Sequence, residues 1–108
     1  MNIISIMTVR VAADQREAAV RAFEARQVLP ECAQAIPGFL HGELALDLDD
    51  AETLRVIAHW QDRAAYDAWV AHPKRDAQAQ DLSHFLLAAP VNQVMRSFTC
   101  FPPEHNNA

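Results

Sequence analysis

Residues 39–61 read FLHGELALDLDDAETLRVIAHWQ, and this stretch determines the predicted fold. Two segments in which apolar and polar residues alternate, Phe39–Leu48 and Thr53–Gln61, flank the acidic pair Asp49-Asp50. Alternation with a period of two on both sides of a short polar turn predicts a β-hairpin. The even-numbered residues form an almost continuous apolar face, which we expect to lie under helices: Leu40, Gly42, Leu44, Leu46, Leu48, Leu54, Val56, Ala58 and Trp60.

The opposite face of the hairpin is mixed in character. It comprises Phe39, His41, Glu43, Ala45, Asp47, Arg55, Ile57, His59 and Gln61. A strand predicted at Ile3–Val11 adds apolar residues to both faces of the sheet. Because one layer of helices covers only one face, apolar area on the other face usually marks a contact surface. We therefore predict a homodimer that associates through its sheets.

The segments on either side of the hairpin complete a β-α-β-β-α-β order. Upstream, the strand Ile3–Val11 precedes a helix over residues 14–29, with Asp14 and Glu17 in a capping box, which Pro30 should end or kink. Downstream we expect a helix capped by Asp62 that runs through His72 and stops at Pro73, a second helix over Lys74–Leu87 and a last strand over Val91–Phe101. This order predicts an α+β, ferredoxin-like fold, in which an antiparallel sheet carries helices on one face.

Length and charge narrow the class of protein. A chain of 108 residues predicts a single domain, which we place at residues 1–101, followed by a disordered tail over residues 102–108. The net charge of -5, with basic residues scattered along the chain, argues against a nucleic-acid partner. No apolar run approaches the roughly 18 residues of a membrane helix, so we expect no membrane partner. The N-terminal residues do not resemble a signal peptide, which makes the cytoplasm the expected compartment.

The glycine and cysteine counts exclude several kinds of site. With only two glycines, Gly38 and Gly42, the chain contains neither a G-x-G-x-x-G turn nor a phosphate-binding P-loop. It also lacks C-x-x-C, H-E-x-x-H and similar spacings, so we expect no metal site. Cys32 and Cys100 are expected to be reduced, buried apolar groups.

Aromatic residues are concentrated in Ala58–Pro73, which reads AHWQDRAAYDAWVAHP and holds both tryptophans and the only tyrosine. Trp60 ends the apolar strand face, and Tyr66, Trp69 and His72 follow at intervals of three, which places them along one stripe of the next helix. Two interpretations stay open. The rings either fill an ordinary core, as most aromatic stripes do, or line a pocket for a flat aromatic guest.

Three motifs carry a resemblance to a known family: HWQD at the end of a strand, AAYDAWVAHP in a helix, and PGFL at the start of the second strand. They resemble the antibiotic biosynthesis monooxygenase family, whose members are dimeric α+β barrels, and the resemblance extends to about Phe101. For quinone-forming members it implies oxidation of a phenolic or anthrone-like substrate by O₂ with no flavin, no metal and no other cofactor. The same architecture also includes haem-degrading oxygenases, small cyclases, decarboxylases and members with no known activity.

The resemblance also implies roles for particular residues. An electron-rich aromatic anion can deliver an electron to O₂, so the protein must take a proton, hold the anionic oxygen and exclude water. The indole N–H of Trp60 and the hydroxyl of Tyr66 are candidate donors, and His72 is a candidate proton acceptor or simply a helix cap. Further candidates for substrate binding are Trp69, Leu44, Val56, Met7 and Phe85.

Three positions depart from the family patterns. Val56 stands where quinone-forming members often carry Asn, while Ala79 and Met7 stand where haem degraders carry His and Asn. Haem degradation is therefore disfavoured. Val56 favours a second hypothesis, a non-catalytic binding or accessory protein that keeps the pocket.

A second polar cluster lies on the mixed face of the hairpin. If paired residue numbers sum to 100, His41 lies opposite His59, with Glu43 next to them. Both imidazoles could titrate near neutral pH. We favour the interpretation that they form hydrogen bonds at the dimer interface.

Overall fold

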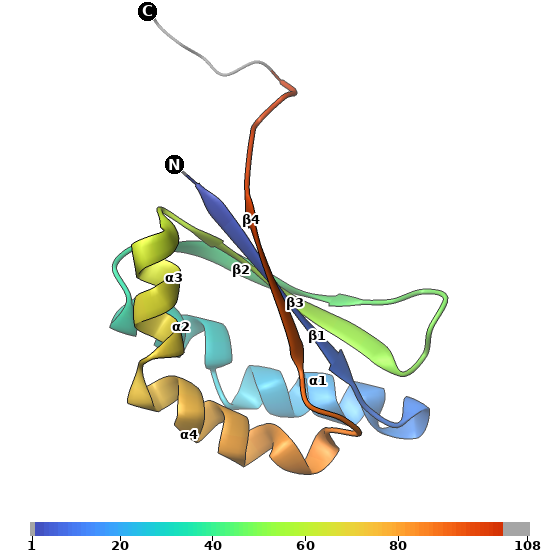
Figure 1. The fold of residues 1–108 in the computed structure, drawn as a ribbon. Helices are drawn as coiled ribbons and strands as arrows, with labels where there is room; N and C mark the ends of the chain where they lie inside the picture. Colours follow the sequence, from blue (N-terminus) through green and yellow to red (C-terminus); the bar gives the residue numbers. More distant parts are fainter. Residues whose placement is uncertain (1, 103–108) are drawn as a thin grey trace, which may run out of the picture.

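The computed structural model describes residues 2–102, so residues 103–108 of the expected tail lie outside the described residues. The elements follow the predicted order, except that the first helical region holds two α-helices rather than one (Figure 1). They are β1 (Ile3–Arg10), the 3-10 helix η1 (Ala13–Gln15), α1 (Arg16–Ala25), α2 (Val28–Ala35), β2 (Phe39–Leu46), β3 (Thr53–Trp60), α3 (Arg63–Val70), α4 (Pro73–Leu82), the 3-10 helix η2 (Ser83–Phe85) and β4 (Val91–Arg96). Within residues 2–102, no helix has the length and apolar content needed to cross a membrane.

The four strands form one antiparallel sheet in the order β2-β3-β1-β4. Figure 1 shows the helices on one face of this sheet, with the other face uncovered. The predicted α+β, ferredoxin-like arrangement is confirmed.

The register of the hairpin is the predicted one except at the start of β2. Paired residue numbers sum to 100 from His41↔His59 onward, but a bulge between Phe39 and His41 pairs Phe39 with Trp60. An extra residue in one strand reverses the faces of the residues beyond it. Phe39 consequently packs edge-on against Trp60, with 5.3 Å between ring centroids, while Leu40 is 49% exposed. The predicted faces of Phe39 and Leu40 are therefore wrong.

The turn of the hairpin begins earlier than predicted. β2 ends two residues before Leu48, and Leu48, expected on the apolar face, is 96% exposed. Asp47 organises the turn, because its Oδ1 accepts hydrogen bonds from the backbone N–H groups of Asp49 and Asp50 at 2.8 and 2.9 Å. Arg55 donates to Oδ2 of Asp47 at 2.9 Å. The hydrogen bond from Arg55, followed by those from the backbone, lowers the pKa of Asp47 to about 2.

The first helical region is two helices rather than one. Asp14 lies inside η1, and no side chain caps either η1 or α1, so the predicted capping box does not form. The helical conformation is interrupted at Gln27, whose φ of 58° is left-handed, and α2 begins at Val28. Pro30 thus falls in the first turn of α2, where a residue without an N–H is tolerated. This is why the break precedes Pro30 by three residues.

The second helical region holds two α-helices, as predicted. Asp62 caps α3 as predicted, with its Oδ1 accepting a hydrogen bond from the backbone N–H of Ala65 at 2.9 Å. α3 ends two residues before His72, and Pro73 begins α4 as its first residue. α4 gives way to η2 before the predicted end at Leu87.

The first and last strands along the chain, β1 and β4, are shorter than predicted. Val11 lies outside β1 in an isolated bridge with Leu86. β4 ends at Arg96, and Phe101, the predicted end of this strand, is 88% exposed. Arg96 pairs with Ile3, the first residue of β1, and one more backbone hydrogen bond follows, from the N–H of Ser97 to the carbonyl of Asn2 at 3.0 Å.

Both cysteines are free. Cys32 is buried as expected, and burial raises the pKa of its thiol to about 12. Cys100 is exposed, contrary to expectation, because it lies beyond the last paired residue of β4.

The return to the sheet at Gly38 leaves no room for a side chain. A Cβ at Gly38 would lie 2.5 Å from the Cβ of Ala65 on α3, which cannot rotate away. We expect Gly38→Ala to lower the free energy of unfolding by about 1–3 kcal/mol, as overpacking does, in urea denaturation.

Gly42→Ala is the matched control for this prediction. A Cβ at Gly42 would meet Cδ2 of Leu29 at 2.9 Å, and that methyl group is the far end of a flexible side chain. The loss of stability should therefore be smaller than for Gly38→Ala. Equal losses in the two variants would contradict the proposed contact with α3.

Candidate functional site

A cavity of about 330 Å³ lies between the sheet and the helices, with a largely apolar lining. Small-molecule sites occupy roughly 300–1,000 Å³, so this volume lies at the lower end of that range. The predicted site residues that line it are Met7, Leu44, Val56, Trp60, Tyr66, Trp69 and Phe85. Trp60 and Trp69 are only 1% and 8% exposed. The aromatic segment thus both packs in the core and walls a cavity, which joins the two interpretations that the sequence left open.

One row of side chains crosses the sheet on the cavity side. Leu44 pairs with Val56, Val56 with Met7, and Met7 with Asn92. Residues paired directly across antiparallel strands share a face, and all four line the cavity. Asn92 was not among the predicted site residues. Its face depends on the register of β4 against β1, which alternation within β4 does not determine.

A hydrogen bond to Ser5 on the neighbouring strand β1 fixes the side chain of Trp60. Its indole Nε1–H donates to Oγ of buried Ser5 at 2.9 Å. An indole has a single N–H, so the prediction that Trp60 donates to a substrate is not supported by this geometry. The Ser5 hydroxyl accepts this bond and keeps its own hydrogen, which makes Ser5 a donor that the sequence analysis missed.

The ring of Tyr66 packs against the ring of Trp60. The two rings meet edge-on, with 5.7 Å between centroids. Tyr66 is partly buried and lines the cavity. Its hydroxyl forms no side-chain hydrogen bond with any other residue in the described part of the chain. The hydroxyl is therefore available to a guest.

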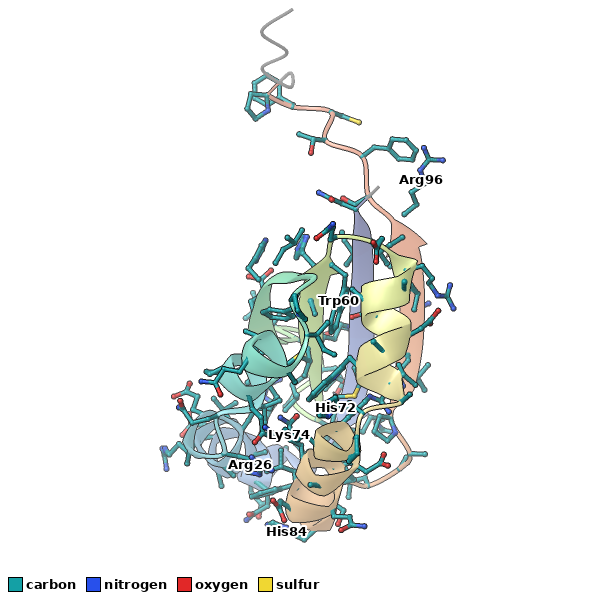
Figure 2. The ribbon with its side chains drawn as sticks, turned by 90° about the vertical axis from the view of Figure 1, so that its left-hand side faces the viewer. Arg26, Trp60, His72, Lys74, His84 and Arg96 are labelled. Carbon is teal, nitrogen blue, oxygen red and sulfur yellow. The ribbon has the colours of Figure 1, made fainter. Side chains whose placement is uncertain are left out.

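His72 occupies a different position from the other predicted catalytic residues. Figure 2 shows it at the junction of α3 and α4, and it is not among the residues that line the cavity. Its ring stacks on Trp69 at 5.9 Å, while its Nδ1 accepts a hydrogen bond from the backbone N–H of Lys74 at 3.1 Å. His72 therefore caps the N-terminus of α4. This arrangement does not support a role as proton acceptor, because the lone pair of the neutral ring is already engaged.

The polar side chains that line the cavity are few. They belong to Ser5, Tyr66, Arg75, Gln78 and Asn92. The amide nitrogen of Gln78 is engaged, since it donates to the carbonyl of Val28 at 3.1 Å and to Glu31 at 2.9 Å. No Asp, Glu or His lies among the lining residues that the structure describes. Nor does any cluster of three or more His, Cys, Asp or Glu side chains within residues 2–102 form a possible metal site.

The predicted histidine pair lies on the uncovered face of the sheet. His41 and His59 are directly opposite each other, as predicted, and their rings stack with 4.1 Å between centroids. Burial, followed by the charge that His41 can carry, lowers the pKa of His59. Their place at a dimer interface stays a prediction.

Comparison with known proteins identifies the family of the chain. The family model of antibiotic biosynthesis monooxygenases matches residues 2–80. The chain belongs to the antibiotic biosynthesis monooxygenase family. The resemblance carried by the three sequence motifs is thereby confirmed. No curated protein matches the chain.

Solved structures share the fold of this monooxygenase-family chain at low sequence identity. A monooxygenase from the gene ActVA-Orf6 of Streptomyces coelicolor, in complex with the ligand nanaomycin D, has a TM-score of 0.78 and 20% identity, covering 95% of this chain and 93% of its own. A mutant of SnoaB, a cofactor-independent oxygenase from Streptomyces nogalater, has a TM-score of 0.69 and 19% identity, covering 94% and 97%. Rv0793 from Mycobacterium tuberculosis has a TM-score of 0.72 and 16% identity, covering 92% and 97%.

Removing the Trp60–Ser5 hydrogen bond should lower the stability of this monooxygenase-family chain. Ser5→Ala would leave the buried indole N–H without a partner, so we expect a loss of about 1–3 kcal/mol in the free energy of unfolding, measured by urea denaturation. Ser83→Ala is the control, because Oγ of exposed Ser83 donates to the carbonyl of Gln80 where water can replace it. Ser5→Ala unfolding at the same urea concentration as Ser83→Ala would show that the buried bond contributes little.

Proposed function

We propose that the protein binds an aromatic phenol or an anthrone-like small molecule in the cavity and oxidises it to a quinone with O₂, without a metal or a flavin. The observation that carries this proposal is the apolar cavity walled by Trp60, Tyr66 and Trp69, with the Tyr66 hydroxyl unengaged by described residues. Aromatic walls suit a flat ring, because offset and edge-on ring contacts are favourable. Membership of the family supports the reaction type.

The proposed reaction converts one substrate and one O₂ into one quinone and one water. Loss of a proton gives an aromatic anion, which passes one electron to O₂. The carbon radical and superoxide then combine to form a carbon–oxygen bond, and the proton returns to give a hydroperoxide. Loss of water breaks the oxygen–oxygen bond and leaves a carbonyl. The ring carbon supplies four electrons in total, so no external reductant is needed.

The side chains of the cavity have different roles in this reaction. The hydroxyls of Tyr66 and Ser5 donate hydrogen bonds to the anionic oxygen, and such donors are worth most where water is excluded. The apolar walls keep water from the radical pair. Because the described lining contains no carboxylate and no imidazole, the proton passes to solvent at the entrance of the cavity.

The same lining also favours a second candidate, a binding or accessory protein without catalysis. Val56 is apolar, and no general base lines the described cavity. Mixing the protein with an anthrone under air and following quinone absorbance separates the two. Tight binding without turnover would support the second candidate.

The proposal includes a homodimer formed through the uncovered sheet face. Ile57 lies on that face between Ile6 of β1 and Glu43 of β2. Apolar side chains left on one face of a sheet usually meet a partner. We also place the protein in the cytoplasm, in keeping with its two free cysteines.

Ile57→Asp tests the dimer. A carboxylate at this position would be buried without a partner, so we expect the variant to be monomeric in sedimentation at micromolar concentration. Ile57→Val keeps an apolar contact and should stay dimeric. A monomeric wild-type protein under the same conditions would refute this part of the proposal.

Tyr66→Phe tests the chemistry. It removes one hydroxyl and leaves the packing almost unchanged, so the melting temperature should stay within a few degrees. Turnover of an anthrone should fall about tenfold or more, as it does when a catalytic hydrogen bond is lost. His72→Asn is the control, because Asn also caps helices and the cap is the role that we assign to His72. Full activity in Tyr66→Phe would remove Tyr66 from the mechanism, and inactive but folded His72→Asn would restore His72 to it.

A further inference from the structure

The cavity has an identifiable entrance. Most of its lining residues are buried or partly buried, and the two that are exposed are Ala79 on α4 and Asn92 on β4. We infer that the entrance of the cavity lies on this side, between α4 and the start of β4.

Arg75 stands on the α4 side of this entrance. It lines the cavity together with Gln78, Ala79 and Leu82, whose spacing of three and four residues places them on one face of α4. Asn92 faces the cavity from the opposite side, on β4. Among the described lining residues, Arg75 is the only one that carries a formal charge at neutral pH.

Arg75 also differs from the other arginines, because its side chain has no partner among the residues that the structure describes. Arg10, Arg21, Arg26, Arg55 and Arg63 form ion pairs, Arg16 donates to backbone carbonyls, and Arg96 lies over the ring of Phe98. Within residues 2–102, the side chain of Arg75 has no ion pair, hydrogen bond or ring contact of these kinds. Arg75 is partly buried as a residue, and a charged group that loses water is costly unless something pairs with it.

The nearby acidic groups do not pair with the guanidinium of Arg75. Glu31, which lies close to the cavity, is already held by Arg26 at 3.2 Å and by Gln78 at 2.9 Å. Asp81 is paired with Arg26 at 2.8 Å. The chain as a whole carries a net charge of -5, so its general field repels anions and any preference for them must come from a local group.

We propose that the aromatic guest carries an acidic substituent, a carboxylate, which Arg75 holds at the entrance of the cavity with Asn92 on the opposite side. This inference rests on the proposed aromatic binding site and names the class of its substrate. A guanidinium can bind a carboxylate through two parallel N–H···O bonds, which fixes the orientation of the guest as well as its charge. The ring then points inward to Trp60 and Tyr66, and the substituent points outward.

The same anionic chemistry can come from an ionised ring hydroxyl instead of a carboxylate. The carboxylate is favoured by position, since Arg75 lines the cavity on the helix that borders its exposed entrance. The oxygen that reacts must instead meet the hydroxyls of Tyr66 on α3 and Ser5 on β1. The two sources are separated by the probes below.

The test is a binding titration that needs no turnover, followed by quenching of tryptophan fluorescence. Its probes are anthraquinone-2-carboxylate, the uncharged methyl ester of that acid, and 2-hydroxyanthraquinone at a pH where it is ionised. We expect the wild-type protein to bind the carboxylate about tenfold or more tightly than the ester, as a charge-assisted bidentate contact permits. Arg75→Met should weaken carboxylate binding about tenfold and leave ester binding within about twofold.

Lys74→Met is the matched control. Lys74 is adjacent to Arg75, carries the same charge and is exposed, but it does not line the cavity. Its removal should leave both affinities within about twofold. Asn92→Ala should weaken carboxylate binding by a smaller factor than Arg75→Met.

Several results would overturn the inference. Equal wild-type affinity for carboxylate and ester would do so without any variant, even if Arg75→Met failed to fold. Equal losses in Lys74→Met and Arg75→Met would assign the effect to the general field. Loss of affinity only for ionised 2-hydroxyanthraquinone in Arg75→Met would assign Arg75 to the ring oxygen. If no probe bound at all, the aromatic site itself, and with it the proposed function, would fail.

Discussion

The hydrogen bond from the indole of Trp60 to Ser5 fixes the inner wall of the cavity. It joins β3 to β1 beneath the helices, where the ring is almost fully buried. Phe39 and Tyr66 then pack edge-on against this ring from β2 and α3. Because a buried indole N–H must find a partner, the ring cannot turn without losing that bond. The positions of Phe39 and Tyr66 along the cavity wall are therefore set against a fixed ring.

Much of the fold follows from local patterns in the sequence, and the errors in its prediction have local causes. Alternation along the hairpin fixed the register from His41 to Leu46, because a period of two assigns each residue to a face. It failed at Phe39 because a one-residue bulge leaves no trace in the alternation itself. The helix break at Gln27 was placed at Pro30 instead, since the sequence marks the proline and not the left-handed residue that precedes the new helix.

The site was predictable where its residues lie on one segment and unpredictable where distant segments meet. Trp60, Tyr66 and Trp69 follow one another in sequence, and their spacing indicated a shared neighbourhood. Ser5, Asn92 and Arg75 join them only through the order β3-β1-β4 and the docking of α4. His72 is a helix cap, one of the two roles that the sequence left open, but it caps the start of α4 rather than the end of the preceding helix.

The stacked histidines on the uncovered face link folding to proton uptake. In the folded chain the pKa of His59 lies below its ordinary value, so the unfolded chain takes up the proton first as the pH falls. The contribution of this residue to stability is therefore complete above the ordinary pKa of histidine. It declines as the pH falls through that value toward the lowered one. Burial of His59, with His41 stacked on it at 4.1 Å between ring centroids, thus makes this end of the hairpin less stable in acid, while Asp47 in the turn at the other end keeps its charge to much lower pH.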